Sequence, residues 1–322
     1  MNTVVIGGGM AGLSCARTLG LAGHTVTVLD KGRGPGGRMA TRRLTAAGGE
    51  TTFDLGTPAF EARSPAFVAE VRQWASDGHA APWPAAGADR WVGVPAMNAP
   101  LRAMADRLDV RWSTRVSQVL PVPDGWQVRT ENGDRLEADT LVIALPADQA
   151  ADLLEPIKAG LAGEMATRAR ACPSLPCWTV LLAFAGPLAG VEDWRAGDAG
   201  EALGLAVRNT AKPGRAGPEA WVLHAGADWS ARHLEDPADQ IEDALIAALS
   251  ARLDGPLPAI IARGAHRWRY AMPPGGGTGP VWDPTLRLGL CGDWLTVSGV
   301  EGAWLSAQDL AARILASDRG QD

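Results

Sequence analysis

The sequence has little of several residue types and patterns, and each shortage excludes a class of protein. Four cysteines in 322 residues are too few for a disulfide scaffold. No apolar run approaches the roughly 20 residues that a membrane-spanning helix needs. The N-terminus lacks the charged and apolar regions of a secretory signal, because a strand-like run, Thr3 to Ile6, begins at once. We therefore expect a cytoplasmic protein that does not contact a membrane.

Positive charge is also scarce. Thirty Lys and Arg oppose 36 Asp and Glu, and the net charge of −6 argues against binding to nucleic acid. Only Lys31, Lys158 and Lys212 are lysines. The histidines never recur at metal-ligand spacing, so we expect no metal; they stand at 24, 79, 224, 233 and 266. A hydrophobic share of 46% is ordinary for a globular chain of about two domains.

The chain begins with a strand–helix–strand unit. Val4 to Ile6 is typical of a buried parallel strand, apolar spacing predicts a helix over 13–21, and a second strand over 25–29 ends at Asp30. Consecutive parallel strands joined by a helix form a right-handed crossover. This unit predicts an α/β domain with a parallel sheet.

The remaining pattern predicts further helices and strands. We expect helices over 65–76, 99–107, 148–168 and 236–252, and one from about 300. We expect strands over 110–112, 116–120, 126–130, 140–145, 178–184, 203–208, 220–225, 262–268 and 286–291. Turn signals at Pro123-Asp124-Gly125 and Asn132-Gly133 predict two hairpins. The whole predicts a nucleotide-binding domain built from both ends of the chain, with a mostly antiparallel domain inserted.

The first turn carries a dinucleotide-binding fingerprint. Gly7, Gly9 and Gly12 form G-x-G-x-x-G after a strand and at the start of a helix, and Asp30 follows the next strand. These glycines allow a tight turn, close approach to a pyrophosphate and close packing of helix on strand. The helix N-terminus offers N–H donors to phosphate, and Asp30 can accept hydrogen bonds from ribose hydroxyls. The alternative is a glycine-rich turn that binds nothing, but the three contexts together favour the fingerprint.

Further features favour FAD over NAD. The run Arg33-Gly34-Pro35-Gly36-Gly37-Arg38 follows the ribose acid, so that backbone can lie along an extended cofactor and Arg38 can meet a phosphate. Near the C-terminus, Gly292-Asp293 follows a strand, and Val300 to Ala303 opens a helix. Backbone N–H groups there could stabilise negative charge on a reduced flavin. The absence of a second G-x-G-x-x-G argues against a separate NADPH domain.

Taken in this order, these motifs resemble the FAD-dependent amine-oxidase superfamily and, within it, the bacterial renalases. The matching stretches include 30–39, Arg90 to Gly93, Lys212 to Arg215, Trp221 to Ala225, 266–270, 291–294 and 300–306. The resemblance implies an α/β fold like that of p-hydroxybenzoate hydroxylase. An FAD-binding Rossmann-like domain (1–62, 96–148 and 264–322) would carry an inserted, mostly antiparallel α+β substrate domain (63–95 and 149–263) over the flavin.

The resemblance also implies the cofactor contacts and the reaction. Non-covalent FAD would be held by Gly7, Gly9, Met10, Ala11, Gly12, Asp30, Lys31, Gly37, Arg38, Val116, Gly292, Asp293, Glu301, Gly302 and Ala303. Glycines of the fingerprint and Arg38 would hold the phosphates, Val116 the adenine, and Glu301 to Ala303 the isoalloxazine. Bacterial renalases oxidise 2- and 6-dihydro isomers of NAD(P). Hydride passes to flavin N5 and the electrons then pass to O2, which gives NAD(P)+ and H2O2.

One departure leaves the substrate open. Similar sequences read D-x-G-A-Q-Y-F where this chain has Asp54-Leu55-Gly56-Thr57-Pro58-Ala59-Phe60. An oxidase of amines or of another small molecule with the same fold is therefore an alternative, and a relative that has lost flavin and only binds is another. We see no acid–base pair, and hydride transfer to a flavin needs none.

The candidate substrate-cavity residues are His224, Trp178, Trp268 and Tyr270. Aromatic walls suit a planar substrate, although a tryptophan or a histidine in an apolar run is more often part of the core. Arg208 and Arg215 could hold a phosphate of a dinucleotide substrate. Lys31 lies in the adenosine region, and Lys212 lies in a Lys-Pro-Gly turn. We therefore expect neither lysine to assist amine oxidation beside the flavin.

Overall fold

The computed structural model describes residues 1–46, 49–157 and 160–319. By its internal contacts the chain divides into two units. Unit 1 comprises Met1–Gly37, Leu101–Ser174 and Pro273–Asp322, and unit 2 comprises Arg38–Pro100 and Leu175–Met272. The sequence interpretation differs from this division at four stretches. It placed 38–62, 96–100 and 264–272 with the nucleotide-binding domain, whereas they belong to unit 2, and it placed 149–174 with the substrate domain, whereas they belong to unit 1.

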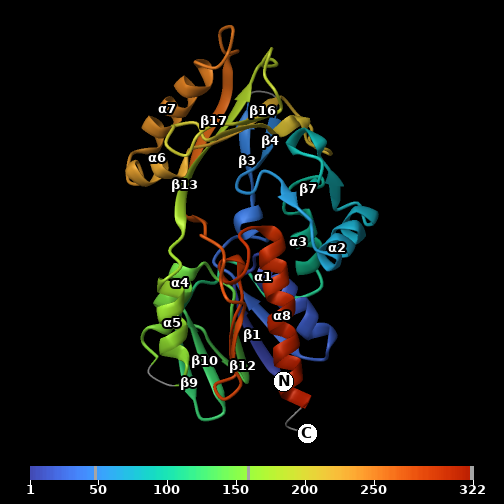
Figure 1. Ribbon diagram of the computed structural model, residues 1–322, viewed down its shortest axis with the longest axis vertical. Coiled ribbons are helices and arrows are strands. Elements are labelled where there is room, and N and C mark those ends of the chain that lie inside the picture. The colour runs from blue at the N-terminus through green and yellow to red at the C-terminus, as the bar shows by residue number, and fades with distance from the viewer. Residues whose placement is uncertain (47–48, 158–159, 320–322) are drawn as a thin grey trace. The chain divides into compact units, whose positions relative to one another are not determined.

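Unit 1 is built around a six-stranded sheet in the order β18-β19-β12-β1-β2-β8 (Figure 1). All neighbours are parallel except β18 and β19. The strands are β1 (Asn2–Ile6), β2 (Thr25–Leu29), β8 (Asp109–Arg111), β12 (Thr140–Ile143), β18 (Val281–Asp283) and β19 (Leu288–Leu290). Helices α1 (Met10–Leu21) and α8 (Val300–Arg319) pack side by side, and the Thr18 hydroxyl of α1 contacts Gln308 Oε1 of α8 at 3.1 Å.

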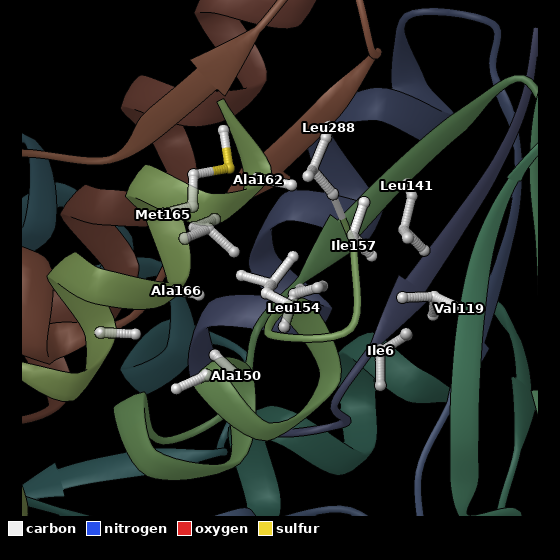
Figure 2. Packing of buried hydrophobic residues seen from close by; sticks show 14 of the residues in the cluster. Ile6, Val119, Leu141, Ala150, Leu154, Ile157, Ala162, Met165, Ala166 and Leu288 are labelled. Carbon is white, nitrogen blue, oxygen red and sulfur yellow. The ribbon is translucent and has the colours of Figure 1, made fainter. Parts of the chain in front are cut away.

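The opposite face of this sheet carries the main apolar core of unit 1. Ile6 of β1, Leu141 of β12 and Leu288 of β19 pack there against a second sheet and two helices (Figure 2). The second sheet is an antiparallel meander of β9 (Val116–Val122), β10 (Gly125–Thr130) and β11 (Arg135–Ala138). The helices are α4 (Ala147–Leu154) and α5 (Ala162–Arg170). The sheet is therefore covered on both faces, as a parallel sheet requires.

Unit 2 is built around a five-stranded antiparallel sheet in the order β14-β15-β16-β13-β17. The strands are β13 (Leu175–Phe184), β14 (Trp194–Ala196), β15 (Leu205–Arg208), β16 (Glu219–His224) and β17 (Ile260–Met272). One face packs against α7 (Ala238–Ser250) through Ile241, Leu245 and Leu249. A short helix, α6 (Ala227–Arg232), follows β16.

The other face of the unit 2 sheet is covered by a hairpin of β3 (Thr41–Ala46) and β4 (Gly49–Asp54). Phe53 and Leu55 pack there on Leu181 and Val222. A small sheet of β5 (Phe60–Glu61), β7 (Arg90–Gly93) and β6 (Ala80–Pro82) lies beside α2 (Pro65–Ser76). The rings of Phe60, Phe67 and Trp74 meet edge to face or tilted between them.

The predicted α/β fold is confirmed, and so are both hairpins of the meander. The prediction of one helix over 148–168 was wrong, because α4 ends at Leu154 and α5 begins at Ala162. Pro156 follows α4 and cannot supply the N–H that a continued helix needs. The β3–β4 hairpin and α6 were not predicted. α3 (Ala99–Ala105) and α2 begin where the sequence placed them.

Candidate functional site: a dinucleotide cradle and a polar sheet face

The glycine-rich turn after β1 leaves no room for side chains at two of its positions. Gly7 has φ +116°, and a Cβ there would lie 2.4 Å from the Ala144 carbonyl oxygen. A Cβ on Gly12 would lie 1.8 Å from the Gly7 carbonyl oxygen. Both distances are far below van der Waals contact, so this path of the backbone from β1 into α1 requires glycine.

The start of α1 is open toward an anion. Gly9 is the N-cap residue and, as a glycine, has no side chain with which to cap the helix. A Cβ on Gly9 would meet nothing nearer than Gly37 Cα, at 3.9 Å. The N–H groups of Met10, Ala11 and Gly12 have no intrahelical acceptors at this position, and the helix dipole adds positive potential. These donors suit a pyrophosphate.

Asp30 lies at the end of β2 beside this turn. Its carboxylate accepts hydrogen bonds from the N–H groups of Gly8 and Gly32, each at 2.6 Å. Two bonds fix the carboxylate but leave acceptor capacity for a diol such as a ribose, since an ionised carboxylate offers about four lone-pair positions. The Thr114 N–H binds the Asp30 carbonyl oxygen at 2.8 Å, which brings the segment that leads to Val116 against the same loop.

The C-terminal motif forms a second fixed turn in unit 1. The Gly292 N–H donates to Ser306 Oγ at 3.0 Å, and the buried Asp293 carboxylate accepts from the Gly299 N–H at 3.0 Å. A Cβ on Gly302 would lie 1.6 Å from the Val297 carbonyl oxygen. These contacts set the start of α8, so the backbone of Glu301 to Ala303 occupies its first turn.

The structure thus places most of the predicted cofactor residues within unit 1, around the starts of α1 and α8 and the end of β2. Lys31 is exposed next to Asp30, and Val116 opens β9. Arg38 lies just beyond the unit boundary, where its Nη1 donates to the Ala271 carbonyl oxygen at 3.3 Å. Two helix starts, the Asp30 carboxylate and turns without side chains fit the pyrophosphate and ribose of FAD.

In unit 2, two of the candidate cavity residues share one face of the sheet. Thr179 of β13 stands opposite His224 of β16 and His266 of β17, and directly opposite residues project on the same side. His224 Nδ1 lies 3.1 Å from Thr179 Oγ1. The Trp268 ring meets His266 edge to face at 4.4 Å, and its Nε1 donates to the Leu55 carbonyl oxygen at 3.3 Å. We call His224, Thr179, His266 and Trp268 the polar row.

The other two candidates do not join the polar row. Trp178 lies on the opposite face, packed in the apolar cluster with α7, and its Nε1 donates to the His233 carbonyl oxygen at 2.9 Å. Tyr270 is half-buried on β17, at a point where the register with β13 is irregular. The structure therefore groups His224 with Trp268 and assigns Trp178 to the core.

Burial, aided by nearby positive charge, keeps the two histidines neutral. Burial, with a contribution from the positive charge of Lys212, lowers the pKa of His224 to about 4. Burial and the positive charge of Arg42 lower the pKa of His266 below its ordinary value. Both imidazoles therefore remain uncharged at neutral pH.

A buried ion cluster that the sequence did not reveal lies at the end of β4. The Asp54 carboxylate binds Lys212 Nζ at 2.8 Å and Arg215 Nη2 at 2.5 Å, and accepts the Met97 N–H at 3.0 Å. The side chains of Asp54 and Lys212 are fully buried, and that of Arg215 is 3% exposed. The two cations hold the pKa of Asp54 below its ordinary value against the opposing effect of burial. Two basic side chains thus face one carboxylate, and burial lowers the pKa of Lys212 while the charge of Asp54 opposes that fall.

The hydrogen bonds and ion pairs of Arg215 and Arg208 do not agree with the role that the sequence predicted for them. Arg215 also donates to the Gly93 and Pro213 carbonyl oxygens at 2.5 and 2.7 Å. Arg208 binds Asp193 and Glu219 at 3.0 Å each. The expectation that they hold a substrate phosphate is corrected, because the protein's own carboxylates already occupy both.

The fold and the cradle of unit 1 define a dinucleotide-binding flavoprotein. A family profile described as flavin containing amine oxidoreductase matches residues 83–315, and one described as NAD(P)-binding Rossmann-like domain matches residues 5–73. The chain belongs to the family of flavin-containing amine oxidoreductases. Membership makes FAD the cofactor and flavin-dependent oxidation the class of chemistry, as the sequence predicted.

The similar proteins are named as oxidases of different substrates, and the solved structures among them share the fold of this chain. An L-amino-acid oxidase of Daboia russelii is 51% identical over 47 residues, which are 15% of this chain and 9% of that enzyme. A protein of Exiguobacterium sp. 255-15, provisionally described as a protoporphyrinogen oxidase, superposes with a TM-score of 0.73 at 13% identity over 97% of this chain and 98% of its own. Cyclohexylamine oxidase of Brevibacterium oxydans gives 0.70 at 15% identity over 100% and 99%.

Further observations concern membrane-spanning helices and the cysteines. No helix in the described part of the chain is both long and apolar enough to cross a membrane. The four cysteines are free, and Cys15, Cys177 and Cys291 are buried. Burial raises the pKa of the Cys177 thiol to about 12, so it is inert as a nucleophile at neutral pH.

Proposed function

We propose that this chain oxidises the 2- and 6-dihydro isomers of NAD(P) with FAD and O2, and yields NAD(P)+ and H2O2. When bound, FAD accepts the hydride and returns the electrons to O2. The protein's own residues then have to bind the dinucleotide, orient its ring and exclude water. No residue has to abstract a proton, which agrees with the lack of an acid–base pair in the motifs.

The observation that carries this proposal is the sign of the charge around the polar row. Burial is the main cause of the lowered histidine pKa values there, and the positive charges of Lys212 and Arg42 add to it. The nearby carboxylate of Asp54 is already bound by two basic side chains. A primary amine is an ammonium ion at neutral pH, because its pKa is near that of lysine, about 10.4. Such a cation would meet like charge. A dihydronicotinamide has a neutral ring and anionic phosphates, which this environment favours.

The lysines support the same choice. Lys31 is exposed beside the ribose acid, and Lys212 is buried against Asp54 with its Nζ 5.4 Å from the centre of the Trp83 ring. Lys158 lies outside the described residues. Within the described part of the chain, the lysines are thus occupied in roles other than amine oxidation.

The experiment is a product balance in air. The FAD-loaded enzyme is supplied with 6-dihydro-NAD, with ordinary NADH, or with cyclohexylamine or putrescine as amines. We expect one H2O2 and one NAD+ for each 6-dihydro-NAD consumed, at rates at least 100-fold above those with the amines. Turnover of an amine with no turnover of 6-dihydro-NAD would overturn the proposal and leave FAD binding unaffected.

A further inference from the structure

The polar row begins where the apolar cover of its sheet face ends. Along β13, Ala183 and Leu181 point toward the β3–β4 hairpin and are packed beneath Phe53. The next residue on this face is Thr179, which is fully buried, flanked by two half-buried histidines. The face therefore changes from a closed apolar core to a polar strip.

His224 has one nitrogen satisfied by the protein and one that is not. Its Nδ1 is 3.1 Å from Thr179 Oγ1 and 4.0 Å from Cys177 Sγ. Its Nε2 is buried and has no hydrogen-bond partner among the described residues. A core histidine normally satisfies both nitrogens, because an unmet buried polar atom costs roughly 1–3 kcal/mol. An orphaned nitrogen is tolerated where a ligand supplies the partner.

The chemistry of the missing partner follows from the state of the ring. A neutral imidazole presents at Nε2 either an N–H donor or a lone pair, according to its tautomer. A carboxylate or an ammonium would pair best with a charge, which this ring lacks at neutral pH. A carboxamide carries both an acceptor oxygen and an NH2 donor, so it satisfies Nε2 in either tautomer. A dihydronicotinamide ring carries one carboxamide.

We propose that His224 is the specificity-determining residue for the carboxamide of the nicotinamide ring, which hydrogen-bonds to its Nε2, and that Thr179 is a positioning residue that holds the imidazole through Nδ1. This inference rests on the proposed function. His266 and Trp268 flank the same position as the wall of the row.

The test compares two ligands that differ only in the nicotinamide. NAD+ and ADP-ribose are titrated calorimetrically into the FAD-loaded enzyme and into its His224→Leu variant, with His233→Gln, at the C-cap that follows α6, as the matched histidine control. We expect His224→Leu to weaken NAD+ binding about 10- to 100-fold, as loss of a buried hydrogen bond does, and to leave ADP-ribose binding unchanged. His233→Gln should leave both affinities unchanged.

Thr179 is tested by rescue. Thr179→Val removes the hydroxyl and should weaken NAD+ binding about tenfold, whereas Thr179→Ser keeps the hydroxyl and should restore it. A packing role alone would predict the reverse, because Val matches Thr in shape and Ser does not. The Tm of unliganded His224→Leu should not fall, since the change removes an unsatisfied nitrogen.

The outcomes distinguish a failure of the His224 role from a failure of the proposed function. If flavin in the wild-type enzyme is reduced by 6-dihydro-NAD but His224→Leu binds NAD+ as well as wild type, the role of His224 is overturned and the function stands. If 6-dihydro-NAD does not reduce wild-type flavin and NAD+ does not bind, the function fails and the inference fails with it. Equal weakening of NAD+ and ADP-ribose in His224→Leu would show general damage and would also overturn the carboxamide contact.

Discussion

Removal of the Asp54 charge should strongly destabilise unit 2. Asp54→Asn keeps the size of the side chain and an oxygen for the Met97 N–H, but leaves Lys212 and Arg215 without their counterion. Both cations are almost fully removed from water, so neither can regain hydration in the folded state. Breaking a buried ion pair in this way costs about 3–5 kcal/mol.

The assay is urea unfolding followed by tryptophan fluorescence, with FAD in excess for all variants. We expect Asp54→Asn to lose about 4 kcal/mol of unfolding free energy. The double variant Asp54→Asn/Lys212→Met should be more stable than Asp54→Asn alone, because it removes one of the stranded charges. Glu131→Gln, an exposed carboxylate that faces Arg115 at 3.4 Å, is the control and should change stability by less than about 1 kcal/mol.

Two results would refute this reasoning. A loss below about 1 kcal/mol in Asp54→Asn would mean that the cations find water or another partner in the folded state. A double variant less stable than the single one would mean that Lys212 stabilises unit 2 by packing against Trp83 rather than by its charge. Either result would also weaken the argument that positive charge around the polar row disfavours an amine substrate.

Two further predictions test the cradle and the histidine. Gly12→Ala should abolish FAD binding or folding, because its Cβ would lie 1.8 Å from the Gly7 carbonyl oxygen. Gly20→Ala, in the open part of the same helix, is the control and should be neutral or stabilising by up to about 1 kcal/mol. The flavin content of each purified variant measures whether FAD binding is kept. The pKa of His224 is lowered to about 4 in the folded chain, from its ordinary value of 6.5. As the pH falls, His224 therefore binds a proton below pH 6.5 in the unfolded chain but only below about pH 4 in the folded chain. Stability should therefore fall by up to about 3 kcal/mol from this residue between pH 6.5 and 4, and the wild-type pH profile should be steeper there than that of His224→Gln; parallel profiles would contradict it.

Local pattern was enough to predict the dinucleotide cradle of unit 1. The strand, the glycine spacing and the acid after the second strand are all within 30 residues, and each requirement is a steric or dipolar one that the sequence displays directly. The Gly302 contact with Val297 is equally local. The break between α4 and α5 could have been predicted from Pro156, since a helix rarely continues through proline.

Long-range pairing explains what the sequence did not reveal in unit 2. Asp54 and Lys212 are 158 residues apart, and charged residues are usually exposed, so nothing local marks them as a buried pair. Trp178 and Thr179 are neighbours on one strand and must face opposite ways, but alternation cannot say which face becomes core. That was decided by α7 on one side and the β3–β4 hairpin on the other.

The central claim is tested most directly by anaerobic stopped-flow mixing of the FAD-loaded enzyme with its candidate reductants. The absorbance of oxidised flavin near 450 nm is followed after mixing with 6-dihydro-NAD, ordinary NADH or an amine. The account predicts fast bleaching with 6-dihydro-NAD and slow or no bleaching with the other two. Fast bleaching by an amine, with 6-dihydro-NAD inert, would contradict it.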